Sequence, residues 1–423
     1  MNWLTWLVNA YSLPLAALIP VAGRIGDIYG PRKLFQIGVL GLGLGSFLCG
    51  TAISVSWLII GRITQALGAA LLAPNSLAIL LESATIENQG QILGTWNAIS
   101  AFGAVIGPVF SGMLVEAFSW KSSYIIIAGL ALVIAFTARN LGMQEERSSH
   151  KCRETETGLV DYKGSFSLMC AVTFFLLSLT LLPDWGWQNI WIKAGFGLFL
   201  IFVYIFYRVE KTIKDPLLDL RLLSVPFFSL GLLVSFIEQL VMAGTLFVLP
   251  IYFSTVKGFT ASQTALFLAP CALSMALCMP LGGKLSDRFG PGPPIVAGMI
   301  LRTISFIFLA LVVVGTPYHY IALYLILNGI GYSLSSTPAL NAVISTVNAD
   351  RHASTSGVYN MVRYTSAAAG TTLAGIILYT LIPSSFTSIT TAIPGFKEYY
   401  LFGAAACLPG IAAGIALWKQ KYI

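Results

Sequence analysis

The sequence has 423 residues, of which 57% are hydrophobic and only 10% are charged, and its mean hydropathy is +0.81. This balance excludes a water-soluble globular domain of this length and indicates a membrane protein. The net charge of +7 does not indicate a nucleic-acid partner, because the basic residues lie in alternate loops between apolar runs.

Apolar runs of about twenty residues recur along the chain, and each is long enough to cross a hydrocarbon core about 30 Å thick. We predict about thirteen transmembrane helices from them. In chain order the runs lie near 3–22, 34–54, 57–81, 91–116, 122–139, 164–183, 189–207, 226–253, 262–282, 293–314, 318–345, 355–381 and 399–418. The six cysteines fall mostly inside these runs without metal-like spacing, and the three histidines fall in loops, so no metal site is predicted and no cofactor is assigned.

Lys and Arg are concentrated in one of the two alternating sets of loops. That set holds Arg24, Arg32, Lys33, Arg139, Arg147, Lys151, Arg153, Lys163, Arg208, Lys211, Lys214, Arg221, Lys284, Arg288, Arg351, Lys419 and Lys421. The opposite set holds only Lys121, Lys193, Lys257 and Lys397. By the positive-inside rule the rich set is cytoplasmic, and the C-terminus with it. The first run lacks a basic leader and a small-residue cleavage site, so it is not expected to be a cleavable signal peptide.

One long polar stretch, residues 140–163, interrupts the apolar pattern and is predicted to be a cytoplasmic linker. It separates an expected N-terminal bundle, residues 1–139, from two transmembrane helices over 164–207. A C-terminal bundle over 208–423 follows these two helices. The segment 183–187, which joins the two helices, carries tryptophans typical of the membrane–water interface.

A polar segment between the first two apolar runs recurs, imperfectly, between two later runs. Residues 23–33 read GRIGDIYGPRK and residues 283–293 read GKLSDRFGPGP, each with an aspartate four residues after the first glycine. The recurrence predicts a protein of two related halves, as many transporters are. The segment resembles the loop signature of the major facilitator superfamily, to which the chain is similar from end to end. The resemblance implies an all-α polytopic fold with two pseudo-symmetric helical bundles.

The resemblance implies that the loop signature takes part in the conformational change of transport. Its residues here are Asp27, Arg32, Asp287 and Arg288. We expect Asp27 to lie just beyond the end of a helix. There its carboxylate could accept hydrogen bonds from the N-terminal amides of the next helix, or pair with a nearby arginine.

The two helices over 164–207 and the following Asp215-Pro-Leu-Leu-Asp-Leu-Arg221 resemble the 14-helix drug/proton antiporter branch, of the QacA and EmrB kind. In that branch the first signature loop follows the second helix, and Trp6-Leu-Val-Asn-Ala-Tyr11 resembles the start of that helix. The resemblance therefore implies that the chain begins one helix late. A misplaced start or lost coding sequence is favoured over a functional thirteen-helix design.

The fourth apolar run is similar to the antiporter motif of the superfamily, with a serine at one glycine position. The motif residues are Gly94, Gly103, Gly107, Pro108, Ser111 and Gly112. Glycines at these spacings let a neighbouring backbone approach closely, and a proline can kink the helix. The resemblance implies a bend about which the cavity opens, and the alternative is ordinary packing of small residues.

Arg62 and Gln65 lie in a segment that resembles the superfamily pattern Arg-x-x-Gln-Gly-x-Gly. An arginine about five residues inside a span needs a partner or water. The resemblance implies that Arg62 takes part in proton movement near the missing first helix. The alternative is that the Arg62 side chain snorkels to the outer interface.

Three further charged residues lie within spans. Glu238 is the one acidic residue that we place at bilayer depth, where a carboxylate costs a few kcal/mol unless it is protonated, paired or hydrated. It is either the proton-coupling group of a cavity or a structural partner of Arg302. Arg363, with Asn360, resembles an Asn-x-x-Arg pattern of the superfamily, and a structural role is an equal alternative.

The expected function is proton-coupled secondary transport, with export of hydrophobic or cationic compounds by drug/proton antiport. The expected protein is a monomer in the lipid bilayer of a bacterial cytoplasmic (inner) membrane or a plasma membrane, and its partners are a small-molecule substrate and protons. The alternatives are a proton-coupled uptake permease for a specific metabolite and a truncated, non-transporting membrane protein. An enzyme is not expected, because the histidines are scattered and only one carboxylate lies at bilayer depth.

The charge asymmetry predicts the orientation of the loops. Cysteines placed in the loop 183–187 should react with a membrane-impermeant reagent on intact cells. Cysteines placed in 24–33, 140–163 or 284–288 should not react until the membrane is opened. Labelling of the 140–163 linker from outside would reverse the predicted orientation.

Overall fold

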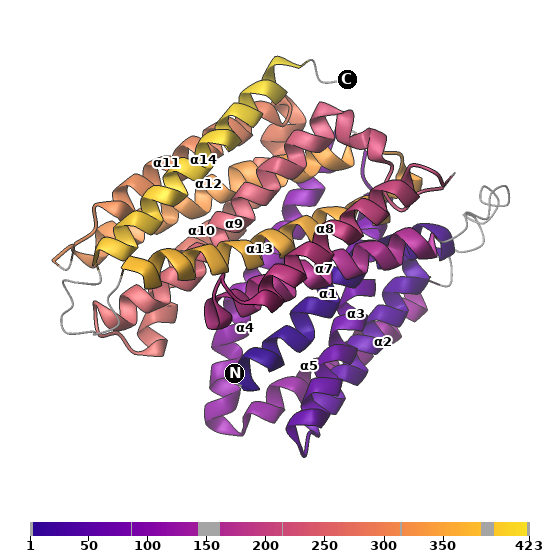
Figure 1. Ribbon diagram of the computed structural model, residues 1–423, viewed down its shortest axis with the longest axis horizontal. Coiled ribbons are helices and arrows are strands. Elements are labelled where there is room, and N and C mark those ends of the chain that lie inside the picture. Colours follow the sequence, from indigo (N-terminus) through magenta and orange to yellow (C-terminus); the bar gives the residue numbers. More distant parts are fainter. Residues whose placement is uncertain are drawn as a thin grey trace. The chain divides into compact units, whose positions relative to one another are not determined.

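The computed structural model describes residues 3–85, 87–142, 161–213, 215–313, 315–381 and 393–420. Most of the predicted linker 140–163 lies outside these residues. The described part of the chain consists of α-helices and short 3₁₀ turns joined by brief loops (Figure 1). The α-helices are α1 (Trp3–Tyr29), α2 (Pro31–Gly50), α3 (Val55–Leu81), α4 (Gln89–Ala117), α5 (Trp120–Gly142), α7 (Tyr162–Trp185), α8 (Ile190–Glu210), α9 (Pro226–Thr255), α10 (Ala261–Phe289), α11 (Gly292–Ala310), α12 (Tyr318–Ile344), α13 (His352–Leu381) and α14 (Ile393–Lys419). The 3₁₀ turns are η2 (Leu220–Ser224) and η3 (Ala349–Arg351).

The helices confirm the expected all-α polytopic fold. Each of the predicted apolar runs coincides with one of the long helices, and ten helices in the described residues are long and apolar enough to cross a membrane. Helix α12 does not meet that criterion, because its middle carries a run of serine, threonine and asparagine, most of which is buried. A polar stretch of this kind is tolerated in a membrane when it faces protein rather than lipid.

The signature segments are shorter hinges than the sequence predicts. Helix α1 continues to Tyr29 and α2 begins at Pro31, so that only Gly30 separates them. Gly30 has φ 94°, in the left-handed region that favours glycine, and Gly290 has φ 80° at the corresponding point after α10. The expectation that Asp27 lies beyond a helix end is therefore wrong, since Asp27 belongs to the last turn of α1.

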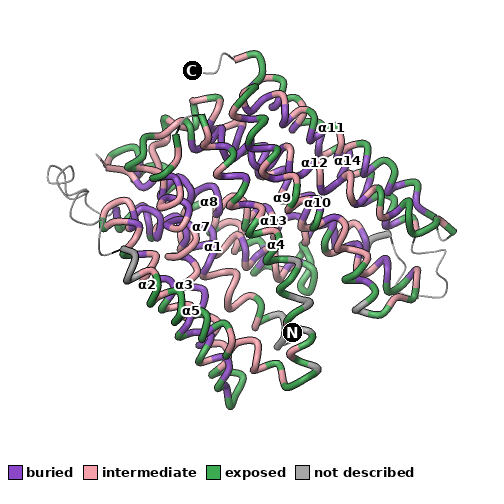
Figure 2. Tube along the Cα trace, turned by 180° about the vertical axis from the view of Figure 1, so that it is seen from behind, coloured by how far each residue is buried: buried purple, intermediate pink, exposed green. Residues whose placement is uncertain are grey.

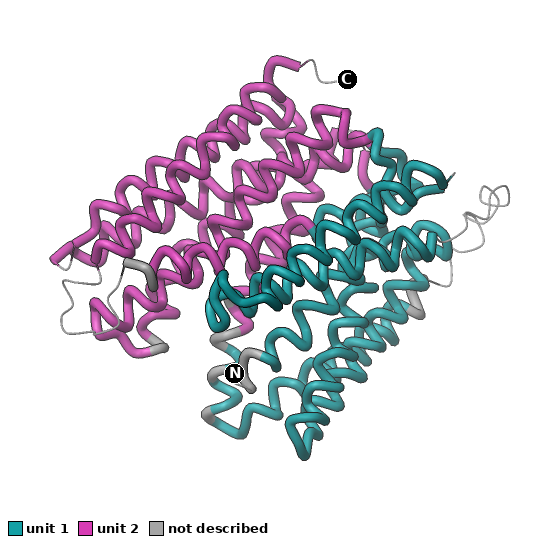
Figure 3. The backbone as a smooth tube through the Cα atoms, in the orientation of Figure 1, with its two compact units in different colours: residues 1–83, 110–221, 347–361 teal, residues 84–109, 222–346, 362–423 magenta. Residues whose placement is uncertain are grey.

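The described chain divides into two compact units (Figure 3). Unit 1 contains residues 1–83, 110–221 and 347–361, and unit 2 contains 84–109, 222–346 and 362–423. Helices α4 and α13 each contribute residues to both units. The predicted division at 139, 163 and 207 follows the order of the chain and stays a prediction.

In unit 1, α1 packs on α2, α3 and α7, α2 packs on α3 and α5, and α7 packs on α8. The α7–α8 pair is joined through aromatic contacts, including stacked Phe174 and Phe202 with ring centroids 5.7 Å apart. In unit 2, α12 packs on α9, α10 and α11, and α14 packs on α9 and α11. Buried and exposed residues alternate along the long helices (Figure 2), as expected where one face packs on protein and the other meets lipid.

Glycine brings α2 and α3 into backbone contact. A β carbon built on Gly68 would overlap the backbone of Leu42 and Gly41, and one built on Gly45 would overlap the backbone of Gln65. Gly61 similarly lies against Cys49. Close approach of this kind supplies the packing that holds helices together where lipid removes the hydrophobic driving force.

Substitution Gly68→Ala should therefore destabilise unit 1. The added methyl group has no space between the two backbones, and overpacking of this kind costs about 1–3 kcal/mol. The measurement is the unfolding temperature in detergent. Gly197→Ala on α8, where a β carbon would meet nothing within 4 Å, is the matched control and should leave that temperature unchanged. Equal unfolding temperatures for both variants would contradict the close α2–α3 packing.

Candidate functional site

Asp27 binds the beginning of a helix that lies far away in the sequence. Its Oδ1 accepts a hydrogen bond from the backbone amide of Ala353 at 3.0 Å, and its Oδ2 accepts one from the amide of Ser354 at 2.9 Å. These are the second and third residues of α13, whose amides have no partner within their own helix. A carboxylate at a helix N-terminus also interacts favourably with the helix dipole. We call this contact the α1–α13 latch.

The second signature segment makes the same contact in unit 2. Asp287 Oδ1 accepts from the amide of Gly90 at 2.7 Å, and Oδ2 accepts from the amide of Gln91 at 2.8 Å. Gly90 and Gln91 are again the second and third residues of a helix, α4. We call this contact the α10–α4 latch.

The first glycine of each signature segment makes its latch possible. A β carbon on Gly23 would overlap the carbonyl of Ala353, and one on Gly283 would overlap the carbonyl of Gly90. The expectation that Asp27 accepts helix N-terminal amides is therefore correct, but the donor is α13 and not the next helix, α2.

Two buried asparagines support the signature segments in a parallel way. In α3, Asn75 lies where a β carbon on Gly26 would overlap its side-chain oxygen. In α12, Asn341 Nδ2 donates to the hydroxyl of Ser286, which stands at the place of Gly26 in the second copy. Sequence reasoning missed both asparagines, although each stands in an otherwise apolar or small-residue helix, which is a usable signal.

Arg32 and Arg288 of the signature segments have contacts of their own. Arg32 forms an ion pair with Glu82 at 2.8 Å, at the partly exposed ends of α2 and α3. The guanidinium of Arg288 lies over the ring of Phe289, 5.2 Å from its centroid.

Arg62 contacts two residues of α1. Its Nε donates to the carbonyl of Leu7 at 3.3 Å, and its guanidinium lies 4.7 Å from the ring centroid of Tyr11. Its NH1 also donates to Gln65 Oε1 at 3.1 Å, and Gln65 Nε2 donates to the hydroxyl of Ser46 at 2.8 Å. Arg62 and Gln65 thus form one polar network that joins α1, α2 and α3.

The antiporter-motif glycines of α4 have two different surroundings. A β carbon on Gly94 would overlap the backbone of Met279 and Pro280 on α10, so this glycine permits close packing. A β carbon on Gly103 or Gly107 would meet nothing within 4 Å, so close packing does not explain these two glycines. Helix α4 continues through positions 108 and 112, and the side chains of Pro108 and Gly112 lie outside the described set.

In unit 2, Glu238 and Arg302 lie beside each other in the core. Their side chains are 1% and 0% exposed, and Arg302 NH1 and NH2 donate to the backbone carbonyl of Glu238 at 3.4 and 3.5 Å. The guanidinium lies near the rings of Phe306 and Tyr332, 5.7 and 5.4 Å from their centroids. The pair predicted from the sequence is therefore adjacent, and its hydrogen bonds pass through the carbonyl of Glu238.

The carboxyl group of Glu238 has its own polar surroundings. Ser335 and Ser336 of α12 lie close to it, while Oε1 has no hydrogen-bond partner among the described residues. On the same helix, α12, Asn328 is fully buried, and neither of its side-chain atoms has a hydrogen-bond partner in the described part of the chain. Buried polar atoms without protein partners are unusual and point to a place where water or a ligand contributes.

Arg363 extends this cluster from α13. Its NH2 donates to the Tyr332 hydroxyl at 3.1 Å and to Gln239 Oε1 at 3.3 Å, and the Tyr332 hydroxyl donates to Gln239 Oε1 at 3.1 Å. Tyr332 thus links Arg363 to Arg302, and sequence reasoning missed it, because a tyrosine in an apolar helix is not distinctive. We call Glu238, Gln239, Arg302, Tyr332 and Arg363 the unit 2 polar cluster.

The contacts of Asp27 predict the effect of removing its charge. Asp27→Asn leaves one acceptor oxygen and turns an NH₂ group toward the second amide, and hydrogen bonds to a charged group are worth about 1.5–3 kcal/mol. The transport that the superfamily resemblance implies should fall about tenfold or more, with membrane expression nearly unchanged. Asp184→Asn, at an exposed position in the last turn of α7, is the control. Unchanged transport by Asp27→Asn would make Asp27 a solvated surface charge.

The sequence is similar to those of known membrane transporters. A sequence model described as Major Facilitator Superfamily matches residues 3–371. The multidrug resistance protein Stp of Mycobacterium tuberculosis is 28% identical over 384 residues, which are 89% of this chain and 68% of Stp. The riboflavin transporter RibZ of Clostridioides difficile is 25% identical over 423 residues, 99% of this chain and 90% of RibZ.

The crystal structure of the human organic anion transporter MFSD10 has the same fold. It matches with a TM-score of 0.65 at 15% identity, over 95% of this chain and 83% of MFSD10. The family and these neighbours are transporters rather than enzymes. The chain is an integral, multi-pass membrane protein that belongs to the Major Facilitator Superfamily.

Proposed function

We propose that this transporter exports hydrophobic or cationic compounds in exchange for protons and acts as a monomer. The similarity to Stp, which is named a multidrug resistance protein, supports export of such compounds. The 14-helix branch suggested by the sequence remains part of this proposal.

The observation that carries the proposal is the position of Glu238. It is a carboxyl group that is almost completely buried in unit 2, and its Oε1 has no hydrogen-bond partner among the described residues. Exchange of protons for substrate needs a group that releases its proton when water reaches it and regains it when substrate leaves. A carboxyl group with an unsatisfied oxygen in a polar cluster fits this task better than a fully paired one.

The hydrogen bonds of Arg302 do not involve the carboxyl oxygens of Glu238. Its guanidinium is held by two aromatic rings and by a backbone carbonyl, and these partners remain in place when Glu238 gains or loses a proton. The carboxyl group can therefore change its protonation without losing the hydrogen bonds that fix the arginine.

The latches give the proposed cycle a structural basis. In each unit an aspartate binds a helix N-terminus through two hydrogen bonds, a contact that is either made or broken. A transporter needs interactions of this kind, which favour one conformation without fixing it permanently.

A second candidate function is transport of one specific metabolite. The observation in its favour is the similarity to RibZ, which covers 90% of that riboflavin transporter, a larger share than the 68% of Stp. Accumulation of labelled riboflavin by cells that express the chain, without export of a lipophilic cationic dye, would favour this function.

Proton coupling can be tested with the substitution Glu238→Gln. The variant should reach the membrane at normal levels and still equilibrate a lipophilic cationic dye, but an imposed pH gradient should no longer drive export. The measurement is dye efflux from cells or inverted vesicles with and without the gradient. Glu398→Gln, the same change at an exposed position of α14, is the control and should export normally.

Two outcomes would contradict the coupling role. Full gradient-driven export by well-expressed Glu238→Gln would exclude it. Loss of expression by Glu238→Gln and by Arg302→Gln, with recovery in the double variant, would identify a structural pair instead.

A further inference from the structure

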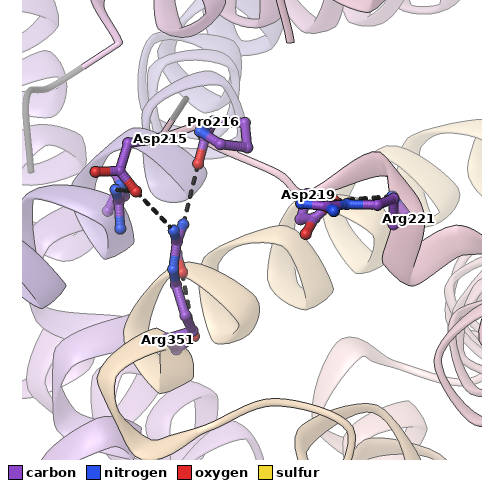
Figure 4. Close-up of polar contacts among 7 residues, drawn as sticks. Asp215, Pro216, Asp219, Arg221 and Arg351 are labelled. Atoms are coloured by element: carbon purple, nitrogen blue, oxygen red, sulfur yellow. Dashed lines mark hydrogen bonds and ion pairs between the residues drawn. The ribbon is translucent and has the colours of Figure 1, made fainter. Parts of the chain in front are cut away.

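A second set of charges lies beside the α1–α13 latch in unit 1. Arg24 on α1 and Arg351, directly before α13, both reach the same oxygen of Asp215: Arg24 NH2 at 3.5 Å and Arg351 NH2 at 3.1 Å. Arg351 NH1 also donates to the carbonyl of Pro216 at 3.0 Å. Figure 4 shows Arg351 pointing toward Asp215 and Pro216, while Asp219 and Arg221 pair with each other.

The segment that carries Asp215 is anchored to unit 1. Leu217 is buried at 2% exposure, and the backbone of Leu217 and Leu218 lies near the carboxyl group of Glu210 at the end of α8. The residue before a proline is biased toward an extended backbone, which restricts Asp215 further. Asp215 is therefore a fixed acceptor, although its own side chain is partly exposed.

The positions of the two arginines tie this contact to the latch. Arg24 is three residues before Asp27, about one turn earlier on α1, and Arg351 is two residues before Ala353, whose amide Asp27 binds. Helix α1 and the start of α13 are thus joined twice, directly through Asp27 and indirectly through Asp215.

The indirect connection has a particular charge balance. Arg24 is buried, and its guanidinium is close enough to that of Arg351 for the two to repel each other. The Asp215 carboxylate lies between the two guanidinium groups and attracts both, which offsets their repulsion. Without the charge of Asp215, Asp27 and Asp350 would still act on Arg24, but the carboxylate that contacts both arginines would be lost and their repulsion would be stronger.

We propose that Asp215 is a positioning residue of the α1–α13 latch: it holds Arg351 against Arg24 and so keeps the first turn of α13 within reach of Asp27. Asp215 does not touch the amides of the latch itself. The role concerns the latch and does not depend on the proposed coupling by Glu238.

Hydrogen–deuterium exchange, followed by mass spectrometry on the full-length protein in nanodiscs, tests this role without any transport substrate. Peptides that contain the amides of Ala353 and Ser354 should exchange about tenfold faster in Asp215→Asn than in the unchanged protein. Peptides that contain Gly90 and Gln91, from the α10–α4 latch, should exchange at the same rate and report on global folding within the same sample.

Three variants separate positioning from general damage. Asp215→Glu should restore most of the protection, because it restores the charge. Asp215→Asn combined with Arg351→Gln should be better protected than Asp215→Asn alone, since the repulsion is removed. Asp219→Asn, the same change four residues later at a carboxylate that binds Arg221, should leave exchange unchanged.

The role is overturned if Asp27→Asn accelerates exchange of the Ala353 and Ser354 amides while Asp215→Asn does not. It is also overturned if Asp215→Asn accelerates exchange equally in the α10–α4 latch, which would show a general loss of structure.

Discussion

The first amides of a packed helix must find acceptors, and in this protein two aspartates supply them. The amides at the start of α13 and α4 cannot bond within their own helices, and each pair is bound by both oxygens of one carboxylate. Four glycines of the signature segments allow these hydrogen bonds to form. Gly23 and Gly283 let the helices approach, and Gly30 and Gly290 turn the chain directly after the aspartate-bearing turn.

The two latches share their central contact but differ in what supports it. The α1–α13 latch has the bridge from Arg24 through Asp215 to Arg351, whereas Lys284 stands at the position of Arg24 in the second copy. In the α10–α4 latch a neutral hydrogen bond joins Ser286 to Asn341. Charge bridges at partly exposed sites weaken as salt screens them, and neutral hydrogen bonds respond much less. A buried asparagine thus lies against each signature segment, and the α1–α13 latch has the charge bridge in addition.

The sequence predicted the fold well and the contacts of the site only in part. Apolar runs report directly on helices in a membrane, so the helix order and the repeat followed from composition and spacing. The carboxylate of Asp27 was correctly expected at a helix N-terminus, but its partner is 326 residues away along the chain. No local pattern reveals a pairing at such a distance. Gly103 and Gly107 were assigned to the antiporter motif, with ordinary packing of small residues as the alternative, and a β carbon on either would meet nothing within 4 Å.

The unit 2 polar cluster shows why a buried charge need not be a fixed ion pair. A lone arginine in an apolar core is costly, and the simplest remedy is a carboxylate partner. Here Arg302 instead uses the carbonyl of Glu238 and the faces of two aromatic rings. Arg363 is likewise bound by the amide oxygen of Gln239 and the hydroxyl of Tyr332. These hydrogen bonds all go to neutral groups, while the positive charges of Arg302 and Arg363 still act on the Glu238 carboxyl.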